Sequence, residues 1–345
     1  KTFTAAALLR AKQQGLLNWD DPIRKHLNDF SLQDAKATEH IAIRDLLCHR
    51  SGLPPHTWAW VYSGCSRNEF IKTRLPHLQS ICGYNDQHAY SNIGYAILGA
   101  VIEAVSGKPW ETYLTDEVLK PMGMTQTQHL DSGWHKQSNM AQPFAMDIGE
   151  PLAIPPFHAE KNHPIAPASE LVSTGPDLLR WLSQHLDSLV VGQLFEPLIP
   201  INDQGLSYGM GWRIEERNQT KEVWHSGSCS GYSSLLALRP EKQDGLFFLS
   251  NTHGITTELR DLSKALFNVW DGKPSPSIDF KPSAYTAPEE NDSAPAPISG
   301  TFLNSGYGTL KINAGRVNMN GSPLGWIQTT SGKLLKLALK DYNLT

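Results

Sequence analysis

The sequence lacks the features that mark several classes of protein. Only four of its 345 residues are cysteines, and they form no C-x-x-C pair and no histidine pairing of the zinc-finger type. No apolar run approaches the roughly 20 residues that cross a bilayer, because glycines or charges interrupt each one. With 30 basic and 34 acidic residues the net charge is −4, so there is no basic surplus to favour nucleic acid as a partner.

Motifs for metals and nucleotides are also missing. The 13 histidines are scattered and form no H-E-x-x-H or H-x-H-x-D pattern, which leaves a metallohydrolase without support. Neither G-x-x-x-x-G-K-[ST] nor G-x-G-x-x-G occurs, so no nucleotide cofactor is indicated. We therefore expect a protein that works without a metal or a cofactor.

Helical periodicity marks the first third of the chain. Apolar residues at helical spacing predict a buried helix over residues 2–14 and a long helix over 91–107, for which Ser91 or Asn92 is available as cap. A short helix within 41–50 should stop at the glycine and prolines that follow it.

The middle of the chain changes to strand patterns. Short alternating or apolar runs between 206 and 251 predict antiparallel strands joined by turns, and residues 256–270 predict an amphipathic helix. Helices followed by a strand meander and a closing helix predict an α+β fold. In it, an antiparallel sheet flanked by helices lies beside an all-helical lobe.

A change of composition divides the chain into three parts. Residues 272–297 are rich in proline, acids and serine and show almost no apolar periodicity, which predicts a solvated linker. We therefore expect a main domain over 1–271 and a small β module over 298–345, with a hairpin around Ala314 and Gly315. The module looks short, and we expect it to be incomplete.

Three short stretches carry residues suited to acyl transfer, a reaction that needs a nucleophile, a base and hydrogen-bond donors for the oxyanion. They are Lys1 at the start of the first helix, Tyr90-Ser91-Asn92 at the head of the long helix, and His225-Ser226-Gly227-Ser228 leading into a strand. Each stretch alone also suits an ordinary helix cap or turn. Their order along the chain favours a functional interpretation.

That order resembles a known family, the serine β-lactamases of the class C type together with related penicillin-binding proteins, esterases and D-aminopeptidases. In this family S-x-x-K precedes F-T-A-A-A, then Y-S-N-x-G-Y follows, and H-x-G-x-x-x-G-x-x-S comes later. The matching segments are Lys1 with Phe3 to Ala7, Ile43 to Pro54, Tyr90 to Tyr95, Leu119 to Met124, Leu171 to Leu178, and His225 to Ser234. The resemblance covers about residues 1–270 and implies the β-lactamase/transpeptidase fold.

The resemblance implies catalytic roles for three side chains. Lys1 would accept or relay the proton of a nucleophilic serine. Tyr90 would act as phenolate or proton relay beside it. His225 would support Tyr90 or the polar end of the substrate.

Four further residues are assigned to substrate binding by the same resemblance. Asn92 would hold the substrate's acyl side-chain amide or orient Lys1. Ser226 and Gly227 are assigned to substrate binding with it, and the backbone N–H of Ser228 would form half of the oxyanion hole.

The sequence departs from the family in three places. The family's nucleophilic serine stands three residues before the lysine, which falls ahead of Lys1, and no serine in the chain has a lysine three positions later. We therefore expect a partial sequence, with the serine and the first strands of the sheet upstream. His225 replaces the lysine of K-T-G, which weakens the case for β-lactam hydrolysis because a full positive charge is lost near neutral pH. Ser169-Glu170 stands where relatives carry two glycines.

Two functions from different classes fit this pattern. The first is a serine hydrolase that forms an acyl-enzyme on a peptide, amide or ester, as a D-amino-acid peptidase, an esterase or a β-lactamase-like enzyme; cell-wall fragments are among its candidate substrates. The alternative is a catalytically inactive homologue that binds peptidoglycan fragments or a protein partner. The resemblance alone favours a periplasmic or secreted location. The oligomeric state stays open.

Overall fold

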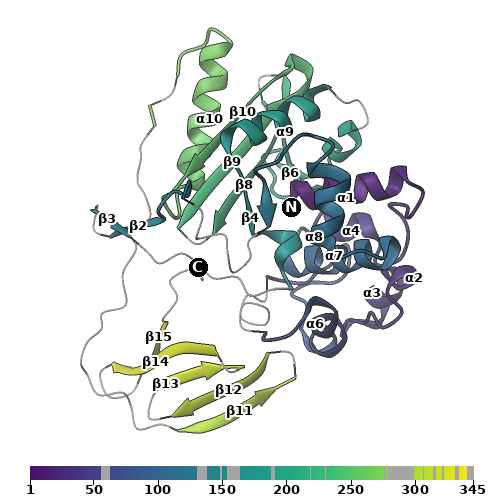
Figure 1. The fold of residues 1–345 in the computed structure, drawn as a ribbon, viewed down its shortest axis with the longest axis vertical. Coiled ribbons are helices and arrows are strands. Elements are labelled where there is room, and N and C mark those ends of the chain that lie inside the picture. Colours follow the sequence, from purple (N-terminus) through teal and green to yellow (C-terminus); the bar gives the residue numbers. More distant parts are fainter. Residues whose placement is uncertain are drawn as a thin grey trace.

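The computed structural model describes residues 1–55, 63–129, 138–147, 150–153, 164–187, 191–217, 219–229, 231–275, 277–278, 299–305, 307–313, 316–320, 322–330 and 334–339. A helical lobe and an antiparallel sheet with helices packed on it make up most of this part of the chain (Figure 1). The helices are α1 (Thr2–Gln13), α2 (Ile23–His26), α3 (Ala35–His40), α4 (Ile43–Leu47), α6 (Arg67–Thr73), α7 (Asn92–Ser106), α8 (Trp110–Leu114), α9 (Gly175–Asp187) and α10 (Thr256–Trp270). Shorter helical turns are η1 (Leu75–His77), η2 (Thr115–Leu119), η4 (Ala166–Ala168), η5 (Val191–Phe195) and η6 (Pro240–Lys242).

The long predicted helix is α7, and its two ends show different chemistry. Gly107 closes it in the left-handed conformation, with φ of 68°, which glycine adopts without a steric penalty. Ser91 is the N-cap residue, yet its side chain makes no capping bond. The Ser91 hydroxyl instead donates to the carbonyl of Pro54, and this contact ties the head of α7 to the loop after α4. The predicted cap position at Ser91 is thus confirmed, although its side chain bonds to Pro54 and makes no bond to the helix end.

The main sheet is an antiparallel meander with strand order β10-β9-β8-β7-β6-β5. Its strands are β5 (Ile199–Pro200), β6 (Ser207–Tyr208), β7 (Arg213–Arg217), β8 (Thr220–Cys229), β9 (Tyr232–Arg239) and β10 (Asp244–Ser250). The sequence placed His225 before a strand. The structure corrects this, because pairing with β7 already begins at Thr220 and His225 therefore lies within β8.

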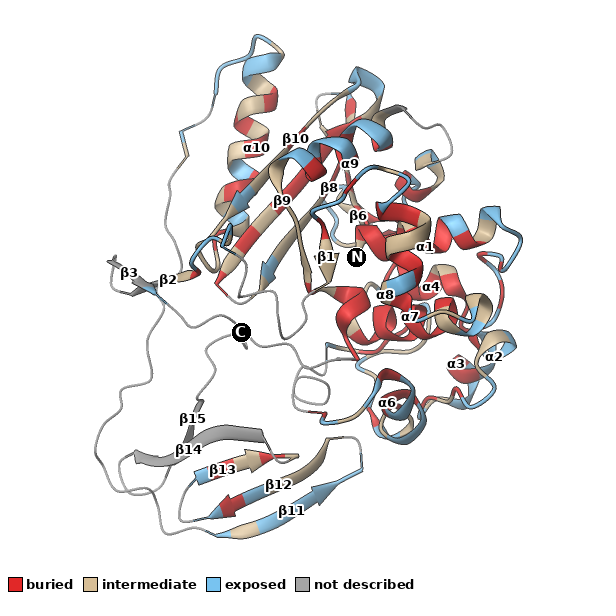
Figure 2. Ribbon diagram, viewed as in Figure 1, coloured by how far each residue is buried: buried red, intermediate tan, exposed pale blue. Residues whose placement is uncertain are grey.

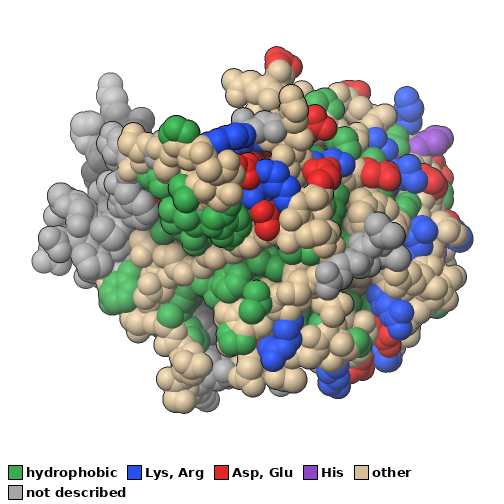
Figure 3. Space-filling model, turned by 90° about the horizontal axis from the view of Figure 1, so that it is seen from above, with side chains coloured by type: hydrophobic (Ala, Val, Ile, Leu, Met, Phe, Trp, Pro, Cys, Tyr) green, Lys and Arg blue, Asp and Glu red, His purple; other side chains and the backbone are tan. Residues whose placement is uncertain are grey.

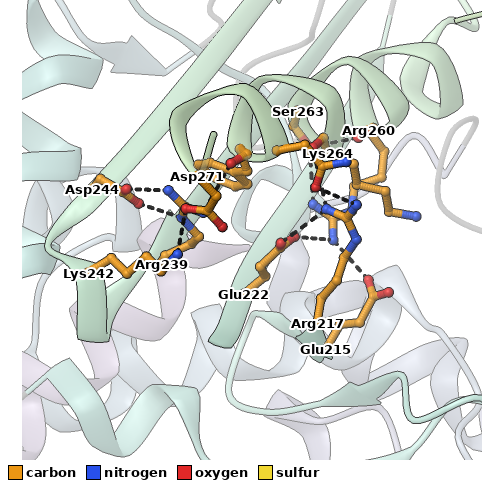
Figure 4. A network of polar contacts seen from close by, with 12 residues as sticks. Glu215, Arg217, Glu222, Arg239, Lys242, Asp244, Arg260, Ser263, Lys264 and Asp271 are labelled. Atoms are coloured by element: carbon orange, nitrogen blue, oxygen red, sulfur yellow. Dashed lines mark hydrogen bonds and ion pairs between the residues drawn. The ribbon is translucent and has the colours of Figure 1, made fainter. Parts of the chain in front are cut away.

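Helix α10 is held on the sheet by two buried arginines (Figure 4). Arg239 on β9 donates to Asp271 just after the helix, at 2.9 Å, and also pairs with Asp244. Arg260 on α10 donates to Glu222 on β8 at 2.8 Å. Because each arginine pairs with carboxylates from other segments, these contacts fix the position of the helix against the sheet.

The largest apolar cluster runs through the helical lobe to the sheet, and a second cluster lies between the sheet and α10 (Figure 2). Phe3 of α1 stacks on Trp181 of α9 with ring centroids 3.9 Å apart. The turn between β6 and β7 comes close to α1 at Gly211, where an added Cβ would lie only 2.9 Å from the Cβ of Ala5. Gly211 also has φ of 85°, so both its conformation and its surroundings require glycine.

Smaller sheets complete the described residues. β1 (Gln128–His129) pairs with β4 (Leu171–Val172), and β2 (Phe144–Asp147) pairs with β3 (Glu150–Ala153). A separate antiparallel sheet follows the chain order β11 (Gly300–Asn304), β12 (Gly308–Asn313), β13 (Arg316–Met319), β14 (Ser322–Thr330) and β15 (Leu334–Leu339).

The C-terminal sheet lies apart from the main sheet in Figure 1. It contacts the helical lobe where Arg74 donates to the carbonyl of Tyr307 at 2.7 Å. Most of the predicted linker and the predicted turn at Ala314 and Gly315 lie outside the described residues. The boundaries at 271 and 298 therefore stay predictions.

On the face seen in Figure 3, acidic and basic side chains are interspersed. Among the helices of the described ranges, none combines the length and the apolar character that a bilayer crossing requires.

Candidate functional site

Lys1 lies at the junction of the sheet and the helical lobe, where the chain enters α1 (Figure 1). Its Nζ donates to Oδ1 of Asn92 at 2.7 Å and to the carbonyl of Ala168 at 3.1 Å. The same Nζ lies 4.7 Å from the ring centroid of Tyr90 and 5.6 Å from that of Tyr95. One ammonium group therefore meets an amide, a carbonyl and two aromatic faces, all from the helical lobe.

The head of α7 supplies the partners of this lysine. Tyr90 precedes the N-cap residue, and Asn92 is the first helical residue. Oδ1 of Asn92 accepts a hydrogen bond from Nζ of Lys1, so the Asn92 side chain points toward the lysine. This contact fits the predicted role in which Asn92 orients Lys1, and both roles considered for Asn92 stay predictions.

The Ala168 carbonyl is positioned by a short segment, residues 164–168, that crosses the lobe. Thr4 donates to the carbonyl of Pro167 at 2.6 Å, and Arg67 donates to that of Pro164 at 3.3 Å. Gly99 on α7 makes room for the segment, since a Cβ there would lie 2.3 Å from Cγ of Pro167. Contacts from α1, α6 and α7 thus position the carbonyl that accepts the hydrogen bond from Lys1.

His225 faces the helical lobe from β8, and both of its ring nitrogens are occupied. Nδ1 lies 2.7 Å from the carbonyl oxygen of Ser226, which can only accept, so Nδ1 carries the proton. Nε2 lies 2.9 Å from the hydroxyl of Tyr208, which donates to it when the ring is neutral. Burial lowers the pKa of His225 well below its usual range, and the positive charges of Lys1 and Arg213 lower it further.

Two side chains that the sequence interpretation did not select link His225 to the lysine. Tyr208 is fully buried on β6, and burial raises the pKa of its phenol well above 10. His49 packs its ring 4.7 Å from that of Tyr208 and 4.3 Å from that of Tyr90, measured between centroids. His49 stood within the matched stretch 43–54, but a single histidine there carried no spacing signal. Tyr208 stood in an ordinary strand pattern.

The predicted residues therefore fall into two groups. Lys1, Tyr90 and Asn92 make direct contacts, while His225 reaches them through Tyr208 and His49. Further along β8, Gly227 has no room for a side chain, because a Cβ would lie 2.7 Å from Oγ of Ser234.

Ser228 is exposed near the end of β8, and its Oγ lies 3.5 Å from Nδ1 of His253. Ser226 lines a cavity of about 370 Å³ between the sheet and α10. Arg213, Trp224 and Arg260 also line this cavity. Ser226 and Ser228 are two positions apart on β8, so they lie on the same face of the strand, opposite to His225 and Gly227.

A family profile described as Beta-lactamase matches residues 1–268. The chain belongs to the Beta-lactamase family. Protein flp of Staphylococcus aureus is 25% identical over 271 residues, which are 73% of this chain and 51% of that protein. The chain thus spans about half the length of this relative.

Solved structures show the same fold. The octameric penicillin-binding protein homologue from Pyrococcus abyssi aligns with a TM-score of 0.67 at 22% identity, covering 100% of this chain and 80% of that one. A D-stereospecific amidohydrolase from Streptomyces sp. aligns with a TM-score of 0.61 at 21% identity, covering 73% and 79%. The predicted β-lactamase/transpeptidase fold is thereby confirmed.

Proposed function

We propose that the full protein is a serine hydrolase that works through an acyl-enzyme on an ester, amide or peptide. The observation that carries this proposal is the placement of Lys1 Nζ against Asn92, the Ala168 carbonyl and the ring of Tyr90. In members of this family that order their motifs similarly, the nucleophile stands three residues before the lysine. We place the serine at that position, in the segment ahead of Lys1.

The proposed reaction divides into two steps. The serine oxygen attacks the substrate carbonyl carbon while its proton passes to Lys1 or Tyr90, and the backbone N–H of Ser228 donates to the oxyanion. The tetrahedral species then collapses, and the leaving group takes the proton as its bond to carbon breaks. A water molecule, deprotonated by the same pair, then attacks the acyl carbon; the ester bond to serine breaks, the serine oxygen takes the proton back, and the acid product leaves.

The neutral state of His225 narrows the substrate class within this proposal. A lysine at this position would offer a full charge to a substrate carboxylate, whereas His225 uses both nitrogens inside the protein. We therefore favour esters and D-amino-acid amides or peptides over β-lactams.

Activity-based labelling of the full-length protein tests the proposal. A fluorophosphonate probe should label one serine, and peptide mapping should place it three residues before Lys1. Turnover of a nitrophenyl ester and a D-alanine anilide should exceed that of a chromogenic cephalosporin. Absence of labelling, or a residue other than serine at that position, would overturn the proposal in favour of an inactive homologue that binds peptidoglycan fragments or a protein.

A further inference from the structure

His49 is a buried residue with an unusual backbone. It is 1% exposed and has φ of 62°, in the left-handed region that non-glycine residues seldom adopt. It follows α4, which ends at Leu47. No step of the proposed reaction uses this side chain, so its conformation and burial need another explanation.

The residue holds the chain on both sides of Tyr90. The His49 carbonyl accepts from the backbone N–H of Ala89 at 2.8 Å. Its ring Nδ1 accepts from the backbone N–H of Ser91 at 3.2 Å. Tyr90 lies between these two contacts, and its ring packs 4.3 Å from the imidazole. His49 thus contacts the chain just before, at and just after Tyr90.

The ring itself is oriented toward the aromatic cluster of the site. Because Nδ1 accepts, the proton of neutral His49 is on Nε2, which is buried and has no hydrogen-bond partner among the described residues. Burial lowers the pKa of His49 well below its usual range, and Lys1 lowers it further. The titratable and charged groups facing it are Lys1 from the N-cap of α1, His88 and Tyr90 from the segment before α7, Tyr95 from α7, Tyr208 from β6, Arg213 from β7 and His225 from β8.

We propose that His49 is a positioning residue that fixes Tyr90 against Nζ of Lys1. The two hydrogen bonds fix the backbone of the residues just before and just after Tyr90, and the imidazole ring packs against one side of the phenol. The inference rests on the proposed function, because Tyr90 has its proton-transfer role only there. It adds a residue that acts through another and does not touch substrate.

Two substitutions in the full-length protein separate these contributions. His49→Ala removes the ring and the acceptor for Ser91, and alanine disfavours the positive φ. His49→Asn keeps a short acceptor and tolerates that φ. We expect His49→Ala to lower kcat on the nitrophenyl ester about 100-fold with KM changed less than about 3-fold, since small misplacements of reacting groups cost about that much. His49→Asn should recover at least about 10-fold of the loss.

A matched control uses His185, an equally buried histidine on α9 whose Nδ1 donates to the Trp181 carbonyl. His185→Asn should leave kcat within about 3-fold of the wild-type value. The proposal is overturned if His49→Ala keeps wild-type kcat, if His49→Asn is no better than His49→Ala, or if His185→Asn loses as much.

Hydrogen exchange of the Ser91 amide gives a readout that does not depend on turnover. His49→Ala should speed this exchange at least about 10-fold, and His49→Asn should not, because only the alanine variant removes the acceptor. Unchanged exchange in His49→Ala overturns the positioning role. A wild-type protein without hydrolase activity would refute the proposed function, while this measurement would still decide whether His49 holds the Tyr90 segment.

Discussion

The hydroxyl of Tyr208 and Nε2 of His225 lie 2.9 Å apart, and this contact makes the histidine an acceptor on that side. The opposite nitrogen donates to the Ser226 carbonyl. A histidine held in this way is neutral and has no free nitrogen for a substrate carboxylate. The residue at the lysine position of K-T-G therefore differs from lysine in hydrogen bonding as well as in charge.

Tyr208→Phe should raise the pKa of His225, because the lost hydroxyl donates to the neutral ring and stabilises it. Long-range proton–nitrogen spectra of labelled histidine follow the ring directly. The wild-type protein should show the Nδ1–H tautomer near neutral pH. A variant with the same tautomer and the same titration as the wild type would contradict the assigned contact.

Tyr90→Phe should abolish most turnover while the fold is kept, since the ring remains and only the proton-transferring oxygen is lost. We expect kcat to fall about 100- to 10,000-fold, the usual contribution of a positioned acid or base. Tyr113→Phe is a suitable control, because the Tyr113 hydroxyl contacts Gln14 away from the site. An undiminished rate in Tyr90→Phe would remove Tyr90 from the proton path.

Gly99→Ala should impair catalysis by moving the backbone carbonyl that accepts from Lys1. Its Cβ would displace Pro167 and with it the adjoining Ala168 carbonyl, which accepts from Lys1. We expect a loss of kcat of about 10- to 100-fold. Gly94→Ala on the same helix has only ordinary contacts at 3.6 Å or more, and should keep activity and add about 1 kcal/mol of helix stability. Equal activity of the two variants would argue against the role of the 164–168 segment.

Stability should fall between pH 6.5 and about 4, before most carboxylates titrate. Burial lowers the pKa of His185 to about 4, and burial with Arg213 lowers that of His88 to about 4. Unfolded histidines bind protons below about pH 6.5, so the stabilising contribution is complete above that pH and is lost as the pH falls toward 4. His185 alone should account for about 3 kcal/mol. Urea unfolding of the wild type and of His185→Asn at pH 7.5 and 4.5 checks this. An equal loss of unfolding free energy between the two pH values in both proteins would contradict it.

Arg260→Met should destabilise the protein by about 3–5 kcal/mol, because it leaves the carboxylate of Glu222 buried without its main partner. Replacing Glu222 by leucine in the same protein should restore part of the loss. Lys72→Met removes an exposed pair with Asp29 and should change stability by less than about 1 kcal/mol. Denaturant midpoints of the three variants give their changes in unfolding free energy. Equal losses in Arg260→Met and Lys72→Met would refute the structural role of the buried pair.

Periodicity predicted the regular elements well, because burial of one helix face leaves a visible spacing. The ranges expected for α7 and α10 agree with the structure to within one residue at either end. The position of His225 within β8 was missed, since the polar residues at 225–228 resemble a turn. His49 and Tyr208 were also missed, because their importance comes from contacts between distant segments that one chain's pattern does not encode.

Gly211 leaves no space for a methyl group between the sheet and the first helix. At that point the β6–β7 turn and α1 are in close van der Waals contact, next to the carbonyl oxygen of Lys1. A larger residue at position 211 would push the β6–β7 turn away from α1 and so shift the backbone of Lys1 relative to the sheet.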